Sequence, residues 1–456
     1  MKTRTLTEGP ITRSLLAFAA PAVAATVLQS LNMSINAMWV GHLIGHEGLA
    51  AAANVNLIAG LVMMMTFGFG TAVSILIARA MGAGDAAGMR RNFGAGLGIF
   101  SVAGVVLSVG AALTIHPILR ALNLPADVYP LALDYARISF AALPIGLLFI
   151  FLMLALRGVG DSRTPLLFVG LSAVIDVGLN PLLILGIAPL PPMGIAGSAL
   201  ASLIASSISL ALLTRYVYAR DLPIRLRGAE LRLIVPPLRL VSTILRQGIP
   251  MGLQMIIASV GSLVMMSLVN GEGTATIAAY AAVAQLWSYV QMPATGLGGA
   301  ASTMAAQNIG AGRWDRVDRI AMASASLGFG ITLFVVLLII ALDQHALGLF
   351  LDQDGASMLI AQHINFCATW SFALYGALLP LVVIPRANGA SIAPLVIMTI
   401  MFIPGRLGFA YLLRPTWGAD AIWWTFPVSF FIAGVLIVGY YRFGGWRRLN
   451  VLTHTA

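Results

Sequence analysis

An acidic residue and an amide lie in the middle of an apolar segment of this chain. Residues 171–186 read LSAVIDVGLNPLLILG, so Asp176 and Asn180 stand four positions apart among aliphatic side chains. Residues at that spacing share one face of a helix. An ionisable group near the bilayer centre costs roughly 3 kcal/mol even on insertion scales, so it usually marks the path of an ion or a substrate. Pro181 follows directly and removes a backbone donor, which loosens the helix beside the polar pair.

The carboxyl group of Asp176 could serve a membrane protein in three ways. Burial disfavours the charged form of a lone carboxyl group, so Asp176 could take up and release a proton. Its carboxylate could instead bind Na⁺ together with nearby side-chain oxygens, because hard cations take oxygen ligands. The third interpretation is a structural polar contact that only ties two helices together.

The composition predicts that the elements around this pair are membrane-spanning helices. Of 456 residues, 59% are hydrophobic and only 9% are charged, whereas a soluble domain carries roughly 25% charged residues. The single cysteine, Cys367, excludes an internal disulfide. Segments of about 20 apolar residues span a bilayer as helices. The sequence therefore predicts an all-α membrane protein with twelve transmembrane helices, near residues 15–40, 49–78, 93–115, 130–156, 165–188, 193–214, 248–269, 276–305, 320–342, 357–385, 391–413 and 421–441.

The basic residues predict the orientation of these spans. With the N-terminus placed inside, 22 of the 26 Lys and Arg residues fall in cytoplasmic segments, and the exceptions are Arg120, Arg137, Arg406 and Arg414. Such a bias follows the positive-inside rule. It predicts a multi-pass protein of the cytoplasmic (inner) membrane with both termini in the cytoplasm. It also accounts for the net charge of +10 without a nucleic-acid partner.

The two halves of the chain repeat each other. Gly70 and Gly82 recur as Gly298 and Gly310, both 228 positions later. Each half contains six predicted spans, so the halves have the same orientation and are expected to be pseudo-symmetric. We expect an N-terminal six-helix bundle over residues 1–214, a basic cytoplasmic linker over 215–247, which could form a surface helix, and a C-terminal six-helix bundle over 248–456.

With these landmarks in order, the chain resembles the MATE family, the multidrug and toxic compound extrusion transporters. The matching pieces include LRGVGDSRTP, DVGLNPLLILG with MGIAGSALAS, and MPATGLGGAASTMAAQNIGAG. The resemblance implies two six-helix bundles that work by alternating access. It also implies export of cationic or amphipathic organic compounds driven by an inward H⁺ or Na⁺ gradient.

The resemblance also implies a cation-coupling site made by Asn36, Asp176, Asn180 and Ser202. The family usually has an aspartate where this chain has Asn36, and it commonly has Asn before Asp where this chain has Asp176 before Asn180. The first bundle therefore keeps one buried acid instead of two. A missing carboxylate weakens a metal site more than a protonation site, which favours H⁺ over Na⁺ at Asp176.

Other polar and soft side chains within the spans are candidates for binding a substrate. Aromatic rings bind organic cations, and methionine suits adaptable apolar surfaces. The candidates are Met63, Met266, Gln285, Tyr289, Trp370 and Tyr375, for each of which ordinary packing is the alternative. Arg406 is expected to snorkel to the interface or to be paired structurally. Asp134 and Arg137, three positions apart, are expected to form a local ion pair.

Two other classes of function remain as alternatives. A lipid-linked sugar flippase of a related exporter superfamily would need a basic cavity, which the second and eighth spans do not predict. An intramembrane enzyme would need a nucleophile with a base, or a set of metal ligands, within the spans, and the sequence offers neither. We therefore expect no enzyme activity, no cofactor besides the coupling ion, and no metal site beyond Na⁺ at Asp176. The expected partners are small organic compounds and the lipid bilayer, and the expected state is a monomer.

Overall fold

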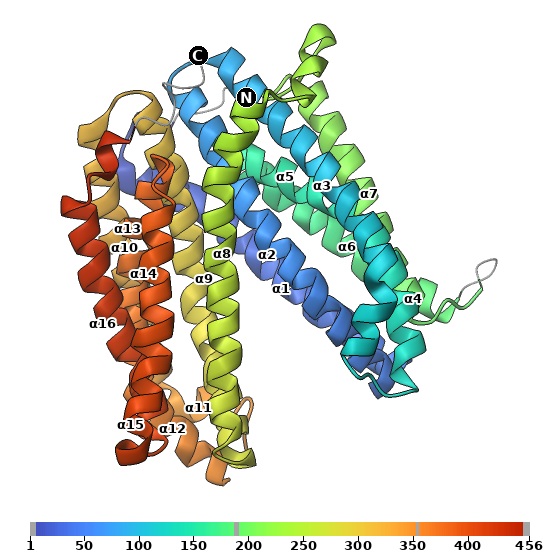
Figure 1. Cartoon of the computed structure of the whole chain (residues 1–456), viewed down its shortest axis with the longest axis vertical. Coiled ribbons are helices and arrows are strands. Elements are labelled where there is room, and N and C mark those ends of the chain that lie inside the picture. The colour runs from blue at the N-terminus through green and yellow to red at the C-terminus, as the bar shows by residue number, and fades with distance from the viewer. Residues whose placement is uncertain (1–5, 187–190, 353–354, 450–456) are drawn as a thin grey trace. The chain divides into compact units, whose positions relative to one another are not determined.

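The structure is a computed structural model that describes residues 6–186, 191–352 and 355–449, and within these ranges it contains helices and no strands (Figure 1). The first half comprises α1 (Ile11–Leu43), α2 (His46–Gly82), α3 (Ala86–Ala121), α4 (Val128–Ala141), α5 (Leu143–Gly158), α6 (Arg163–Leu185), α7 (Ile195–Ala219) and the 3₁₀ helix η1 (Gly228–Ile234). Lys2 and Arg4, two of the basic residues predicted to be cytoplasmic, lie outside the described residues.

The second half has the same kind of helices with more interruptions. It comprises α8 (Leu238–Asn270), α9 (Thr274–Gly310), α10 (Trp314–Ala341), α11 (Asp343–Leu347), α12 (Ala356–Ala368), the 3₁₀ helix η2 (Thr369–Ser371), α13 (Phe372–Ala387), α14 (Ile392–Phe402), the π-helix η3 (Ile403–Gly408), α15 (Phe409–Trp417), α16 (Asp420–Phe443) and the 3₁₀ helix η4 (Trp446–Arg448). The spans predicted at 357–385 and 391–413 are therefore helices with an internal break.

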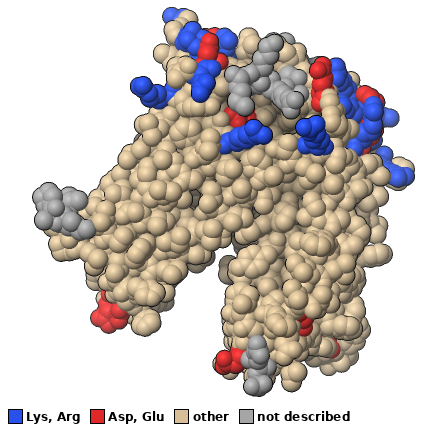
Figure 2. All heavy atoms as spheres, turned by 180° about the vertical axis from the view of Figure 1, so that it is seen from behind, with Lys and Arg blue, Asp and Glu red and all other residues tan. Residues whose placement is uncertain are grey.

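The helices account for the twelve predicted spans. Within the described ranges, ten stretches are long and apolar enough to cross a membrane, and α4 with α5 adds an eleventh that is bent by 49°. The predicted span 276–305 corresponds to α9, which has 37 residues and no charged side chain. The flanks seen in Figure 2 are almost free of charge, and the visible basic side chains gather at one end of each unit. This is the surface expected of helices that face lipid.

The chain forms two compact units. Among the described residues, one unit contains those between 24 and 245, and the other contains residues 6–23 together with those between 246 and 449. The first unit thus takes in most of the segment predicted to be a separate linker, residues 215–247. The N-terminal part of α1 packs in the second unit, where the backbone N–H of Leu6 donates to Gln307 Oε1 at 2.9 Å and Arg313 donates to the carbonyl of Thr7 at 2.7 Å.

The internal repeat is also present in the backbone conformation. Helices α2 and α9 have 37 residues each, and α1 and α8 have 33 each. The turn glycines Gly84 and Gly312 both have φ of 70°, and the pair Gly160 and Gly389 have φ of 92° and 91°. L-residues with a side chain rarely adopt this left-handed conformation, so glycine is needed at these turns. The two halves therefore share local geometry at equivalent positions.

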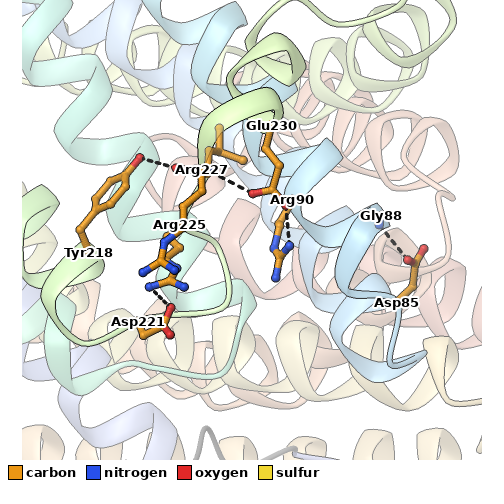
Figure 3. A network of polar contacts seen from close by, with 9 residues as sticks. Asp85, Gly88, Arg90, Tyr218, Asp221, Arg225, Arg227 and Glu230 are labelled. Carbon is orange, nitrogen blue, oxygen red and sulfur yellow. Dashed lines mark hydrogen bonds and ion pairs between the residues drawn. The ribbon is translucent and has the colours of Figure 1, made fainter.

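The segment between the halves is held on α3 (Figure 3). Arg90 Nη1 lies 2.5 Å from Glu230 Oε1, and the backbone N–H of Arg227 donates to Glu230 Oε2 at 3.0 Å. A Cβ atom at Gly98 would collide with the carbonyl oxygen of Ile234, so glycine lets η1 approach the α3 backbone closely. The segment is thus a docked part of the first unit.

This docking predicts a dependence on pH. The hydrogen bond from the Arg227 backbone and the contact with Arg90 lower the pKa of Glu230 below its usual value of 4.5. A lowered folded-state pKa stabilises the docked state above pH 4.5, and this stabilisation is lost as the pH falls through the lowered value. We expect an environment-sensitive dye attached at Leu231→Cys to report a segment that loosens progressively as the pH falls below about 4.5. The same dye on a Glu230→Gln background should report the loosened state at neutral pH, and an identical pH response in both proteins would contradict the assignment.

Candidate functional site

Five polar side chains from three helices meet in the first unit. Asn32 and Asn36 lie on α1, Asp176 and Asn180 lie on α6, and Ser202 lies on α7. Their positions follow from helix periodicity, because the two pairs four residues apart each present one polar face. The contact between α6 and α7 brings Ser202 onto the same carboxylate. The four residues predicted to form a cation site are therefore neighbours.

Asp176 is the centre of this cluster. Its Oδ2 accepts hydrogen bonds from Asn32 Nδ2 at 2.8 Å and from Asn36 Nδ2 at 2.7 Å, and its Oδ1 accepts one from Ser202 Oγ at 3.0 Å. Asn180 Nδ2 donates to Asn36 Oδ1 at 3.1 Å, so Asn180 reaches the carboxylate through Asn36. Asp176 is 3% exposed and Asn180 is fully buried. Three donors stabilise the carboxylate, but all three are neutral.

The negative charge of Asp176 has no cationic partner among the described side chains. None of the ion pairs found there involves this residue. Two acceptor atoms in the same cluster, Asn32 Oδ1 and Asn180 Oδ1, are also buried without a donor. Buried polar oxygens normally have a partner. A small hard cation prefers oxygen ligands such as these, namely the carboxylate of Asp176 and the two amide oxygens that accept no hydrogen bond.

The predicted substrate-binding residues are not collected into one cluster by the described contacts. Gln285 Nε2 donates to the hydroxyl of Tyr289 at 3.2 Å, and both side chains are exposed on α9. Trp370 is also exposed, and Tyr375 lies edge-on to Phe430 with ring centroids 6.1 Å apart. The remaining two candidates, Met63 on α2 and Met266 on α8, are half-buried. The role of all six stays a prediction.

The polar groups of the second unit are mostly paired with one another. Gln254 on α8 contacts Arg386 and donates to the carbonyl of Ser391 at 3.2 Å. Thr369 accepts from Trp287 Nε1 at 2.8 Å and donates to Asn365 Oδ1 at 2.7 Å. These contacts satisfy the polar residues of the predicted seventh and tenth spans, and they leave the buried acid of the first unit as the better candidate for an ion.

The structure changes one prediction for a charged residue and confirms another. Arg406 neither snorkels nor pairs with an acid: it is buried in η3, where its guanidinium carbon lies 4.4 Å from the ring centroid of Phe426. The contact with Phe426 could not be predicted from the sequence around Arg406, because Phe426 lies in α16, in another part of the chain. Asp134 and Arg137 form the predicted exposed ion pair, with Oδ1 and Nη1 3.7 Å apart.

One member of the cluster was missed in the sequence. Asn32 donates to Asp176 as closely as Asn36 does, yet it was not among the predicted site residues. The available signal was the spacing of Asn32 and Asn36, four positions apart as in Asp176 and Asn180. Two polar pairs with the same helical spacing in two apolar spans would have indicated facing surfaces.

Comparisons with known proteins agree with this architecture. A family model described as MatE matches residues 21–182 and 250–412. The chain is 32% identical to the "Probable multidrug resistance protein YoeA" of Bacillus subtilis, over 96% of this chain and 95% of that protein. It is 30% identical to the "Probable multidrug resistance protein YpnP" of the same organism, over 99% of this chain and 100% of that protein. The Vibrio cholerae MATE transporter VcmN in its bent form has the same fold, with a TM-score of 0.88 at 18% identity over 97% of this chain and 98% of that one. The predicted two-bundle, twelve-helix fold is thereby confirmed, and the chain belongs to the MATE family of multidrug efflux transporters.

Proposed function

We propose that this protein exports cationic or amphipathic organic compounds in exchange for an inward-moving cation that binds at Asp176. The observation that carries the proposal is a carboxylate buried in a membrane-spanning helix with neutral donors and no cationic partner. A charge placed in this way is costly unless a cation neutralises it during part of the transport cycle. No cofactor beyond this ion is required.

The same site is suited to either coupling ion. A proton needs only the carboxylate of Asp176. A sodium ion needs several oxygen ligands, and the unpaired Oδ1 atoms of Asn32 and Asn180 lie in the same cluster. We infer that H⁺ and Na⁺ compete for Asp176 and that the amide oxygens are used only when Na⁺ is bound.

The competition predicts a selective effect of removing one amide. In vesicles that contain the Asn180→Leu variant, we expect the Na⁺ concentration for half-maximal ethidium efflux to rise roughly tenfold, because one oxygen ligand of a charged ion is lost. Efflux driven by a pH gradient should change little. Asn54→Leu is the matched control, because Asn54 is a partly exposed amide of the same unit that donates only to the carbonyl of Ala50. If Asn180→Leu lost Na⁺-driven and H⁺-driven efflux equally, the inference that only Na⁺ uses the amide oxygens would be contradicted.

For substrates we propose the residues predicted from the sequence: Met63, Met266, Gln285, Tyr289, Trp370 and Tyr375. They offer rings, thioethers and amides without charge, which is the composition of a binding surface that tolerates many apolar cations. We further propose that the protein acts as a monomer in the cytoplasmic (inner) membrane with both termini in the cytoplasm. The excess of arginine in the predicted cytoplasmic segments supports this orientation.

The proposal is tested by reconstituting the protein in liposomes and following ethidium. Export against the ethidium gradient should require an imposed inward gradient of H⁺ or Na⁺ and should stop when that gradient is collapsed. Ethidium movement that ignores both gradients would refute cation-coupled export.

A further inference from the structure

The second unit holds one buried charge that no acidic group balances. Arg406 is 7% exposed, and its Nε donates to Ser429 Oγ at 3.2 Å. Among the described residues no carboxylate pairs with it, and the bond to Ser429 is the one hydrogen bond that its guanidinium makes. A guanidinium carries five N–H donors, so most of them are unused. Burying a charged donor in this state is unfavourable unless another group binds it for part of the time.

Aromatic rings hold the guanidinium without using its donors. Its central carbon lies 4.7 Å from the ring centroid of Phe402, 4.4 Å from that of Phe426 and 5.7 Å from that of Phe430. Cation–π contacts offset part of the cost of burial. They act on the face of the guanidinium, so the N–H groups at its edge remain free to donate.

The backbone at Arg406 is an interruption in a membrane-spanning segment. The residue lies in the π-helix η3 between α14 and α15, and the same turn contains Pro404, Gly405 and Gly408. Short π-helices inside α-helices are frequent at functional sites. Proline removes a backbone donor and glycine adds freedom, so this turn rearranges more easily than an intact helix. The unused donors therefore lie at a position where access can change.

We propose that Arg406 binds the carboxylate of an aromatic amphipathic compound. The planar fork of a guanidinium matches a carboxylate with two parallel hydrogen bonds. The aromatic cluster around it continues from Phe426 to Trp287, whose ring centroids lie 4.5 Å apart. Both rings are buried, so an aromatic body stacks on this cluster only when the turn at Arg406 opens. This inference rests on the proposed export function, because it extends the exported compounds to those that carry an anionic group.

Binding to the purified protein tests the proposal without an ion gradient. We would measure the affinity of wild type for 2-naphthoate and for 2-naphthamide, which share the ring system and differ in charge. Wild type should prefer the carboxylate roughly tenfold, as expected for a charge-assisted hydrogen bond. Arg406→Gln should lose this preference, and Arg406→Lys should keep part of it. Arg414→Gln should retain it in full, because Arg414 is a partly exposed arginine of the same membrane-spanning stretch, Ile392–Trp417, and pairs with Glu272 at 2.7 Å.

The thermal unfolding midpoint separates this role from a purely structural one. If the guanidinium of Arg406 serves to bind a ligand, Arg406→Gln should unfold at or above the temperature at which wild type unfolds. 2-Naphthoate should then raise the unfolding midpoint of wild type and leave that of Arg406→Gln unchanged. Equal affinity of wild type for the two naphthalene compounds would overturn the proposal whatever the variants do. So would a preference that persists in Arg406→Gln. Failure of the proposed export function would appear separately, as absent gradient-driven ethidium efflux in wild type.

Discussion

Asp176→Asn is expected to lower cation-driven ethidium efflux by roughly tenfold or more, because coupling free energies between sites are typically ~1–3 kcal/mol. Asparagine keeps the size of the side chain and can still accept a hydrogen bond, but it cannot neutralise a bound cation. The fold should survive, since among the described residues no buried cation pairs with Asp176. Efflux in everted vesicles and thermal unfolding of the purified protein measure the two effects separately.

The matched control for this substitution is Asp134→Asn. Asp134 is an exposed acid on α4 of the same unit, where it forms only the pair with Arg137. Exposed ion pairs contribute about 0–1 kcal/mol to stability, so neither efflux nor the unfolding temperature should change measurably. Wild-type efflux in Asp176→Asn would remove this residue from the coupling mechanism.

Gly197→Ala is expected to destabilise the first unit by about 2 kcal/mol, since overpacking typically costs 1–3 kcal/mol. A Cβ atom at Gly197 would lie 2.5 Å from the carbonyl oxygen of Leu183 and 2.6 Å from its carbon. These are backbone atoms of α6, so the contact is relieved only by moving α7 away from α6. That movement carries Ser202 away from the carboxylate of Asp176, and efflux should fall together with the unfolding temperature.

Gly178→Ala provides the control on the neighbouring helix. Gly178 lies two positions from Asp176 on α6, it is exposed, and a Cβ atom there would meet nothing within 4 Å. Alanine is favoured over glycine within a helix by about 1 kcal/mol, so this variant should be slightly more stable than wild type and should transport normally. If both alanine variants behave alike, the close approach of α6 and α7 does not position the site.

Local patterns in the sequence were sufficient to predict the elements and the central acid. Asp176 and Asn180 stand out because polar residues are costly within an apolar span, and their spacing shows that they share a helix face. Repeated glycine motifs predicted the two halves, and the paired left-handed turns at Gly84 and Gly312 follow from the same repeat. Asn36 and Ser202 were predicted to belong to the cation site only through the family resemblance, because the sequence around each of them gives no sign of an ion site.

The features that the sequence did not predict depend on contacts between distant segments. Arg406 is held by rings that α14 and α16 bring together, and no local pattern reveals such a cluster. The segment around Glu230 was predicted to be a basic linker that could form a surface helix, but glycines on α3 allow it to dock. The division of α1 between the two units is likewise a result of tertiary packing, because no Asp, Glu, Lys or Arg interrupts its sequence from Leu15 to Leu43.

The most direct test of the central claim is infrared difference spectroscopy of the purified protein. Spectra recorded with and without the coupling cation, by adding Na⁺ at fixed pH or by lowering the pH, report on individual carboxyl groups. We predict a carboxylate band that shifts with Na⁺, or is replaced by a protonated carbonyl band at low pH, and that is missing from Asp176→Asn. An unchanged difference spectrum in that variant would contradict the claim that the cation binds at this carboxylate.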